Sequence, residues 1–158
     1  MPDDHLILDE VDIVMLRILQ ADASITNAEL AANVGLSPSA CLSRTRRLRE
    51  RGVIEKITAV VNEKTVGLTI TAFAFVTLSK HSRSAAESFL TQIEKIAQVM
   101  ECYNITGRAD YMMKIVAPDI STYRDIVIDQ VIVIPEVEHV ESLVVLKVEK
   151  RSFDLPLE

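Results

Sequence analysis

The first third of the chain carries apolar residues at the spacing of an α-helix. Between residues 11 and 19 they recur at intervals of three and four, so they line one helical face. Asp9 precedes this stretch as a suitable N-cap, and acidic residues nearby favour a helix N-terminus. The pattern predicts a helix whose inward face carries Val11, Val14, Met15, Ile18 and Leu19.

Two further helices are indicated by residues suited to helix ends. In "TNAEL", Thr26 and Glu29 have the spacing of a capping box, which predicts a helix beginning after Thr26. Gly35 can adopt the left-handed conformation that ends this helix. Ser37-Pro38 then supplies an N-cap and a first-turn proline. We therefore expect a third helix that ends before Gly52.

The segment Val53–Asn62 is rich in β-branched residues and alternates, which predicts a strand or small hairpin. Three helices with a tight glycine-containing turn between the second and third are typical of a helix-turn-helix. A hairpin after the third helix would make the motif winged. We expect a winged helix-turn-helix DNA-binding domain over residues 1–61, followed by a polar linker over residues 62–69.

Beyond the linker, strand and helix patterns alternate. The order βαββαβ is that of a ferredoxin-like domain, here over residues 70–158, and the predicted fold class is α+β. The expected elements are a strand at 70–80, a helix at 84–99, two strands joined around Gly107 within 100–117, a helix at 119–134 and a strand at 139–150.

Composition excludes several classes of protein. Hydrophobic residues make up 49% of the 158 residues and Trp is absent, so we expect a folded chain with an aliphatic core. No apolar run is long enough to span a membrane, and the first residues lack the basic segment of a signal peptide, so a cytoplasmic location is expected. Cys41, Cys102 and the three histidines show no metal-ligand spacing, so we expect neither a metal nor a cofactor.

Basic charge is concentrated in one segment of an acidic chain. The whole chain has a net charge of −6, but residues 36–57 hold six basic residues against two acidic ones, a local charge of +4. Five of the six are arginines between Arg44 and Arg51. Such a local field attracts a phosphate backbone, so the expected partner is double-stranded DNA. A solvated arginine-rich helix without a ligand is the simpler alternative.

The third predicted helix divides into an inner and an outer face. Cys41, Thr45 and Leu48 fall on the face that packs against the other helices. The outward N-terminal part of such a helix enters the major groove, where short side chains allow close approach and Arg47 can reach a guanine edge. The other arginines are expected to contact phosphates. The candidate DNA-binding residues are Pro38, Ser39, Ala40, Ser43, Arg44, Arg46, Arg47, Arg49 and Arg51.

Two separated stretches resemble a known family. "LDEVDIVMLRILQADASITNAELAANVGLSPSACLSRTRRLRERGVI" is similar to the N-terminal half of the Lrp/AsnC (feast/famine) regulators, and "ECYNITGRADYMMKIVAPDISTYRDIV" resembles their effector-binding domain. The resemblance implies a winged helix-turn-helix joined to a ferredoxin-like effector-binding and oligomerisation domain. It also implies dimers formed through the C-terminal sheet, assembly into tetramers or octamers, and an amino-acid effector.

The stretch "GRADY" resembles the Gly-x-x-Asp-(Phe/Tyr) turn of the family's effector site. Exposed amides beside Gly107 could bind a carboxylate, and Asp110 could accept from an α-ammonium group. Both residues are also ordinary turn formers, so a role in shaping a hairpin is the alternative. In "VIPEV", Glu136 departs from the glycine that is common in the family. The effector-binding residues that the resemblance implies are Gly107, Asp110, Tyr111, Ile120, Leu143 and Val145.

The expected function is sequence-specific DNA binding that responds to a small molecule. An enzyme is the competing class, because sirohaem decarboxylases resemble these regulators in architecture. No pairing of a histidine with a serine, cysteine or carboxylate is readable here, so we expect no enzymatic activity. An architectural protein that wraps DNA with little sequence preference is a third interpretation.

Overall fold

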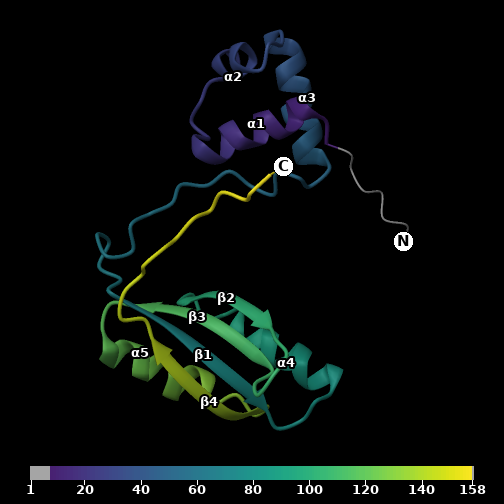
Figure 1. The fold of residues 1–158 in the computed structure, drawn as a ribbon. Coiled ribbons are helices and arrows are strands. Elements are labelled where there is room, and N and C mark those ends of the chain that lie inside the picture. Colours follow the sequence, from purple (N-terminus) through teal and green to yellow (C-terminus); the bar gives the residue numbers. More distant parts are fainter. Residues whose placement is uncertain (1–7, 158) are drawn as a thin grey trace. The chain divides into compact units, whose positions relative to one another are not determined.

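The computed structural model describes residues 8–157, so the acidic start of the chain, with Asp3, Asp4 and His5, lies outside the described residues. Contacts divide the chain into two compact units. One comprises residues 8–60 together with 150–157, and the other comprises Val61–Glu149. Figure 1 shows the helices of the first unit and the four-stranded sheet of the second.

The first unit is built from three helices around a small apolar core. Met15, Leu30 and Cys41, one from each helix, are buried against one another. Leu48 is also fully buried, so the predicted inner face of the third helix is confirmed at both Cys41 and Leu48. The helices are α1 (Glu10–Ala21), α2 (Asn27–Asn33) and α3 (Pro38–Glu50).

The helix ends lie where the sequence placed them. Asp9 and Ser37 each accept a hydrogen bond from a backbone N–H in the first turn of their helix, as N-cap residues do. Thr26 and Glu29 form the reciprocal capping box. Gly35 has a φ of 68°, a left-handed conformation that a residue with a Cβ rarely adopts, and it turns the chain between α2 and α3.

The predicted strand or hairpin at Val53–Asn62 is wrong. The described backbone forms no strand in this segment, and the side chains of Ile57, Val60 and Val61 are exposed. A strand needs a neighbour for its hydrogen bonds, and the segment contains no turn residue that would fold it back on itself. The β-branched composition therefore gives an extended chain. Residues 62–68 follow as turns, closed by the N–H of Leu68 donating to the carbonyl of Glu63.

The second unit is an antiparallel sheet with the strand order β2-β3-β1-β4, which confirms the predicted ferredoxin-like order βαββαβ. The last strand ends earlier than predicted, because its partner β1 begins at Ile70. The elements are β1 (Ile70–Leu78), α4 (Arg83–Ile93), β2 (Val99–Asn104), β3 (Tyr111–Ala117), α5 (Ile120–Ile126), the π-helical turn η1 (Val127–Val131) and β4 (Val137–Val144).

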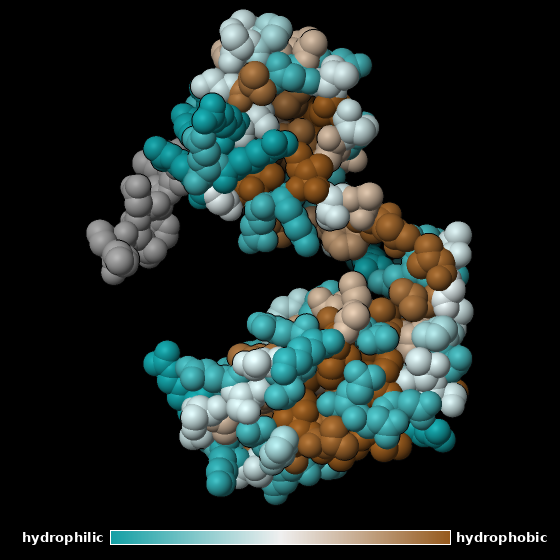
Figure 2. All heavy atoms as spheres, turned by 180° about the vertical axis from the view of Figure 1, so that it is seen from behind, coloured by the Kyte–Doolittle hydropathy of each residue, from teal (hydrophilic) through white to brown (hydrophobic). Residues whose placement is uncertain are grey.

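One face of the sheet carries the core of the second unit. Every second residue of β1 from Ala72 to Leu78 is buried in a cluster that includes Phe89 of α4 and Ile126 of α5. The intervening residues of β1, among them Phe73 and Phe75, are only half-buried and lie on the opposite face of the strand. Apolar side chains thus reach the surface of both units, as Figure 2 shows in brown.

The C-terminal segment contacts α1. The side chain of Gln20 donates to the carbonyl of Leu155 at 3.3 Å and accepts from its N–H at 2.8 Å, while Arg17 Nε donates to the carbonyl of Leu157 at 3.2 Å. The sequence analysis assigned these residues to the ferredoxin-like domain, whereas their contacts group them with the helices. Local sequence patterns do not reveal a contact such as that between Arg17 and Leu157, which are 140 residues apart.

Candidate nucleic-acid interface and effector site

The predicted DNA-binding residues share the outer surface of α3. Ala40 and Arg44 are half-buried at its edge. Thr45, on the predicted inner face, is also half-buried, and its hydroxyl donates to the carbonyl of Cys41 at 3.1 Å. The exposed members of the set are Pro38, Ser39, Ser43, Arg46, Arg47, Arg49 and Arg51.

Two of these arginines contact a carboxylate that the sequence analysis did not single out. Asp12, in the first turn of α1, is only 1% exposed. Its Oδ1 accepts from Arg44 Nη1 at 2.9 Å, and its Oδ2 accepts from Arg47 Nη2 at 2.7 Å. Arg44 Nη1 also donates to Asp9 Oδ2 at 2.5 Å. No spacing within one segment marks Asp12, because its arginine partners lie 32 and 35 residues away along the chain.

The contact between Arg44 and Asp9 shifts the pKa of both groups. The hydrogen bond from Arg44 lowers the pKa of Asp9, with a further lowering from the backbone N–H of Asp12. The same contacts, first with Asp9 and then with Asp12, raise the pKa of Arg44. Both groups are therefore charged at neutral pH, and the carboxylates offset part of the positive charge of α3.

The remaining predicted DNA-binding arginines differ in whether they form an ion pair. Arg46 pairs with Glu50 at 2.6 Å along the helix, in an exposed pair of the kind that contributes little to stability. Arg49 and Arg51 make no ion pair with any residue between 8 and 157. Arg49 lies in α3 and Arg51 is its C-cap, and their charge is the least compensated among the predicted DNA-binding arginines of the described chain.

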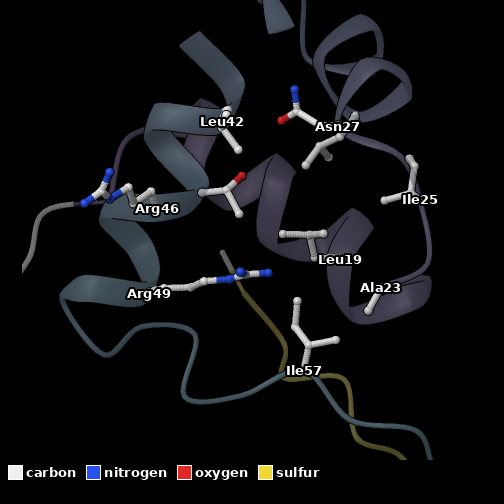
Figure 3. A pocket seen from close by; sticks show the side chains of 10 residues that line it. Leu19, Ala23, Ile25, Asn27, Leu42, Arg46, Arg49 and Ile57 are labelled. Atoms are coloured by element: carbon white, nitrogen blue, oxygen red, sulfur yellow. The ribbon is translucent and has the colours of Figure 1, made fainter. Parts of the chain in front are cut away.

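A shallow apolar hollow of about 330 Å³ lies beside α3. Figure 3 shows Arg49 extending across it toward Leu19, while Arg46 points away from it. Asn27, at the rim, donates through its side-chain amide to the carbonyl of Pro38 at 2.8 Å, linking α2 to α3. The lining carries no carboxylate, histidine or cysteine.

The turn between β2 and β3 has the geometry of an ordered hairpin end. Gly107 has a φ of 127°, which only glycine adopts readily. Asp110 Oδ2 accepts from the backbone N–H of Leu78 at 2.7 Å, and Oδ1 lies 3.1 Å from His81 Nδ1. Both carboxylate oxygens thus already have partners within the chain. These contacts are the ones expected if "GRADY" shapes the end of the hairpin, which is the alternative to a role in binding an effector.

Tyr111 lies in the core rather than on a binding surface. Its side chain is buried, and its ring centroid is 4.9 Å from that of Phe89 on α4. Burial raises the pKa of its hydroxyl. Tyr111 therefore supports the turn through packing.

The other predicted effector-binding residues lie away from this turn, with Ile120 beyond the far end of β3 and Leu143 level with the middle of that strand. Ile120 is exposed and lines a hollow of about 440 Å³ together with Arg124 and Ser142. Leu143 is exposed and pairs with Phe73, and the N–H of Val145 donates to the carbonyl of Thr71 at 2.9 Å. Asp110 and Ile120 flank the two ends of β3, a strand of seven residues that spans roughly 20 Å. One chain therefore does not bring the two sets together.

Within residues 8–157, no group of three or more His, Cys, Asp or Glu side chains is arranged to bind a metal ion. None of the described helices is long and apolar enough to cross a membrane.

Family models match both units. The model described as "Lrp/AsnC ligand binding domain" matches residues 71–155, and the model described as "Winged helix-turn-helix DNA-binding" matches residues 8–55. The chain belongs to the Lrp/AsnC family. Its α+β architecture, a helix-turn-helix unit with a ferredoxin-like unit, is that of an Lrp/AsnC regulator.

Relatives within the Lrp/AsnC family cover nearly the whole chain. The transcriptional regulator AzlB of Bacillus subtilis is 46% identical over 97% of this chain and 98% of its own length. The leucine-responsive regulatory protein of Escherichia coli is 35% identical over 92% of this chain and 88% of its own. A transcriptional regulator of Neisseria meningitidis, solved as a complex with L-Met, has a TM-score of 0.90 at 33% identity over 95% of this chain and 97% of that chain. The protein is a DNA-binding transcriptional regulator of the Lrp/AsnC family with a ligand-binding domain.

Proposed function

We propose that this regulator recognises double-stranded DNA by placing the N-terminal half of α3 in the major groove. Ser39, Ala40 and Ser43 allow the helix to approach the base pairs, and Arg47 offers its unused N–H groups to a guanine edge. Pro38, Arg44, Arg46, Arg49 and Arg51 contact the phosphate backbone and fix the register of the helix.

The observation that carries this proposal is the division of α3 into two faces. Cys41 and Leu48 are fully buried, whereas Ser39 and Ser43 are exposed near the N-terminus of the same helix. The exposed arginines follow toward its C-terminus. The major groove is wide enough to admit an α-helix. Small residues near the N-terminus of α3 allow its backbone to come close to the bases, and the arginines that follow can reach base edges and phosphates.

A gel-shift comparison tests the α3 proposal. The probe is the DNA upstream of the protein's own gene, and the variants are Arg47→Ala and Arg44→Ala. Arg47→Ala is expected to weaken binding by about tenfold or more, since one specific arginine–base contact is worth about 1–3 kcal/mol. Arg44→Ala should also weaken binding, because it removes a proposed phosphate contact. Arg83→Ala, which removes an exposed arginine of α4, is the matched control and should bind like the wild type. If both α3 variants also bound like the wild type, the assignment of α3 would be wrong.

The effector is proposed to be an amino acid. The Neisseria relative was solved with L-Met, and the E. coli relative is named for its response to leucine. In this chain, Gly107 and Asp110 form the proposed polar end of the site, and Tyr111 supports the turn from the core. Ile120, Leu143 and Val145 are proposed as its apolar part.

Because Asp110 and Ile120 lie at opposite ends of β3, we propose that the effector binds between copies of the chain. The copies pair through the half-buried sheet face that carries Phe73 and Phe75, and dimers associate further into tetramers or octamers. Exposed apolar side chains such as Tyr103 and Leu143 support an interface on this sheet. Zwitterion binding then depends on the assembly and not on one subunit.

Calorimetric titration of the twenty amino acids, beginning with L-Met and L-Leu, tests the effector proposal. At least one should bind, and the Asp110→Asn variant should weaken that binding by about tenfold or more, because it removes a charge partner of the ammonium group. Glu87→Gln on α4 is the control and should leave the affinity unchanged. Binding of none of the twenty by the wild type would contradict the proposal.

The proposal includes no catalysis and no cofactor, in keeping with relatives that are transcriptional regulators. A regulator that binds chromosomal DNA acts where the DNA is, so the proposed location is the cytoplasm.

A further inference from the structure

A buried carboxylate of α1 contacts the outer face of α3. Each oxygen of Asp12 accepts one charged hydrogen bond, from Arg44 at 2.9 Å and from Arg47 at 2.7 Å. The two arginines are three residues apart, so they lie one above the other on neighbouring turns of α3. Asp12 thereby connects the first helix directly to two residues that are proposed to contact DNA.

Stability alone does not account for this arrangement. Removing a carboxylate from water is costly, and a buried ion pair is often no more stabilising than apolar side chains of similar volume. A satisfied buried pair does fix geometry, because both oxygens of Asp12 are used and the guanidinium planes are held by them. The arrangement therefore restricts where Arg44 and Arg47 can point.

Each arginine keeps donors that Asp12 does not use. Arg44 is engaged through Nη1 and Arg47 through Nη2, so other N–H groups of both guanidinium planes remain available. The Arg47 side chain is 45% exposed and that of Arg44 is 27% exposed. A fixed and partly exposed guanidinium suits recognition of a base edge, since little side-chain entropy is lost on binding.

Asp12 also reduces the charge that these arginines present to DNA of any sequence. Non-specific binding depends on the number of phosphates that cations neutralise. An arginine paired with a buried carboxylate contributes less to that number than one that is free to follow the backbone. Holding two arginines in this way lowers non-specific affinity while preserving contacts made at one fixed geometry.

We propose that Asp12 is a positioning residue that raises operator specificity, by aligning Arg47 for a base edge and holding Arg44 for a phosphate contact at one fixed place, so that neither arginine is free to follow the backbone of DNA of any sequence. This inference rests on the proposed reading of DNA by α3. It distinguishes Asp12 from Asp9, which contacts Arg44 alone and from an exposed position.

The test compares the affinities of wild type and Asp12→Asn for two duplexes, the DNA upstream of the protein's own gene and a random sequence of equal length, over a range of salt concentrations. In Asp12→Asn, the released arginines should raise the affinity for random DNA. The slope of the logarithm of this affinity against the logarithm of salt concentration should become steeper by about one to two, since one or two more phosphates are neutralised. The affinity for upstream DNA should fall, so the ratio of the two affinities drops by about tenfold or more. A merely structural role would instead lower both affinities together and leave the ratio unchanged, which would overturn the inference.

Asp9→Asn is the matched control, because asparagine keeps the N-cap and only the exposed pair with Arg44 is lost. Its affinity ratio should stay within about threefold of the wild type. If Asp12→Asn does not fold, the double variant Asp12→Leu with Arg44→Met removes the buried charge and one partner together. It should fold, and its ratio should lie about tenfold or more below that of Arg44→Met alone, which removes the arginine and keeps Asp12. Equal ratios in these two variants would overturn the inference. A wild type that does not distinguish the two duplexes would count against the proposed function itself.

Discussion

At the scale of the residue, short-range contacts set the charge state of the helix-turn-helix. Glu29 accepts from the hydroxyl of Thr26 at 2.6 Å and from its N–H at 3.0 Å, and these hydrogen bonds lower the pKa of Glu29 from its usual 4.5. Asp9, paired with Arg44, and Asp22, bonded by Ser24, likewise have a lowered pKa. Each contact favours the ionised carboxylate in the folded protein.

These lowered pKa values predict acid sensitivity of the helical unit. A carboxyl whose folded pKa lies below its unfolded value stabilises the fold above the unfolded pKa, and this contribution is lost as pH falls through the folded pKa. The thermal stability of the helical unit should therefore decrease as pH falls below about 4.5, the usual value for Glu29. Circular dichroism melts between pH 7 and pH 3 measure this, and Glu29→Gln should show a shallower decline than Glu87→Gln, the control on α4. Equal declines would show that the capping box does not contribute.

Residue-level reasoning from sequence succeeded where the chemistry is local. Asp9, Thr26 and Ser37 cap their helices through partners three residues away, a distance that spacing reveals. Asp12 was missed because its partners Arg44 and Arg47 lie 32 and 35 residues away, and nothing in the spacing of one segment reveals a contact in another. "GRADY" was placed correctly around a positive-φ glycine, but the partners that Leu78 and His81 provide to Asp110 come from a different strand and loop.

Among the secondary-structure elements, a strand forms only where a neighbouring strand can pair with it, whatever the residue composition of the segment. The β-rich Val53–Asn62 forms no strand, because no neighbouring backbone pairs with it, whereas the equally β-rich β1 lies between β3 and β4. The second helix of the ferredoxin-like unit continues as the π-helical turn η1, which periodicity near 3.6 residues does not distinguish from α-helix. The order of the elements was nonetheless readable, since alternation and helical periodicity are local properties.

The contact of the C-terminal segment with α1 predicts a stabilising role for a segment without regular structure. Deleting residues 150–158 removes the hydrogen bonds to Arg17 and Gln20. At about 0.5–1.5 kcal/mol for each of these three hydrogen bonds, the helical unit should lose roughly 1.5–4.5 kcal/mol of stability.

Amide hydrogen exchange measures this loss element by element. Exchange of the α1 amides should accelerate in the deletion variant, while the amides of β1 should keep their protection. Lys147→Ala, which alters an exposed ion pair just before the deleted segment, serves as the control and should change neither. Unchanged exchange in α1 of the deletion variant would show that the contact does not stabilise the unit.

At the scale of the whole molecule, the charge distribution explains how an acidic protein can bind a polyanion. The chain carries a net charge of −6, yet five arginines lie between residues 44 and 51. Some of that charge is compensated, since Arg44 and Arg47 contact Asp12 and Arg46 contacts Glu50. Arg49 and Arg51 are not paired within residues 8–157, so they should dominate the attraction to phosphates.

Recognition of DNA by α3 is tested by the salt dependence of DNA binding. The logarithm of the wild-type affinity for the upstream DNA should fall steeply with the logarithm of salt concentration, and Arg49→Ala and Arg51→Ala should each reduce the slope by about one. Arg83→Ala, on α4 of the other unit, should leave the slope unchanged. A flat wild-type slope, or α3 variants with the same slope as Arg83→Ala, would contradict the account.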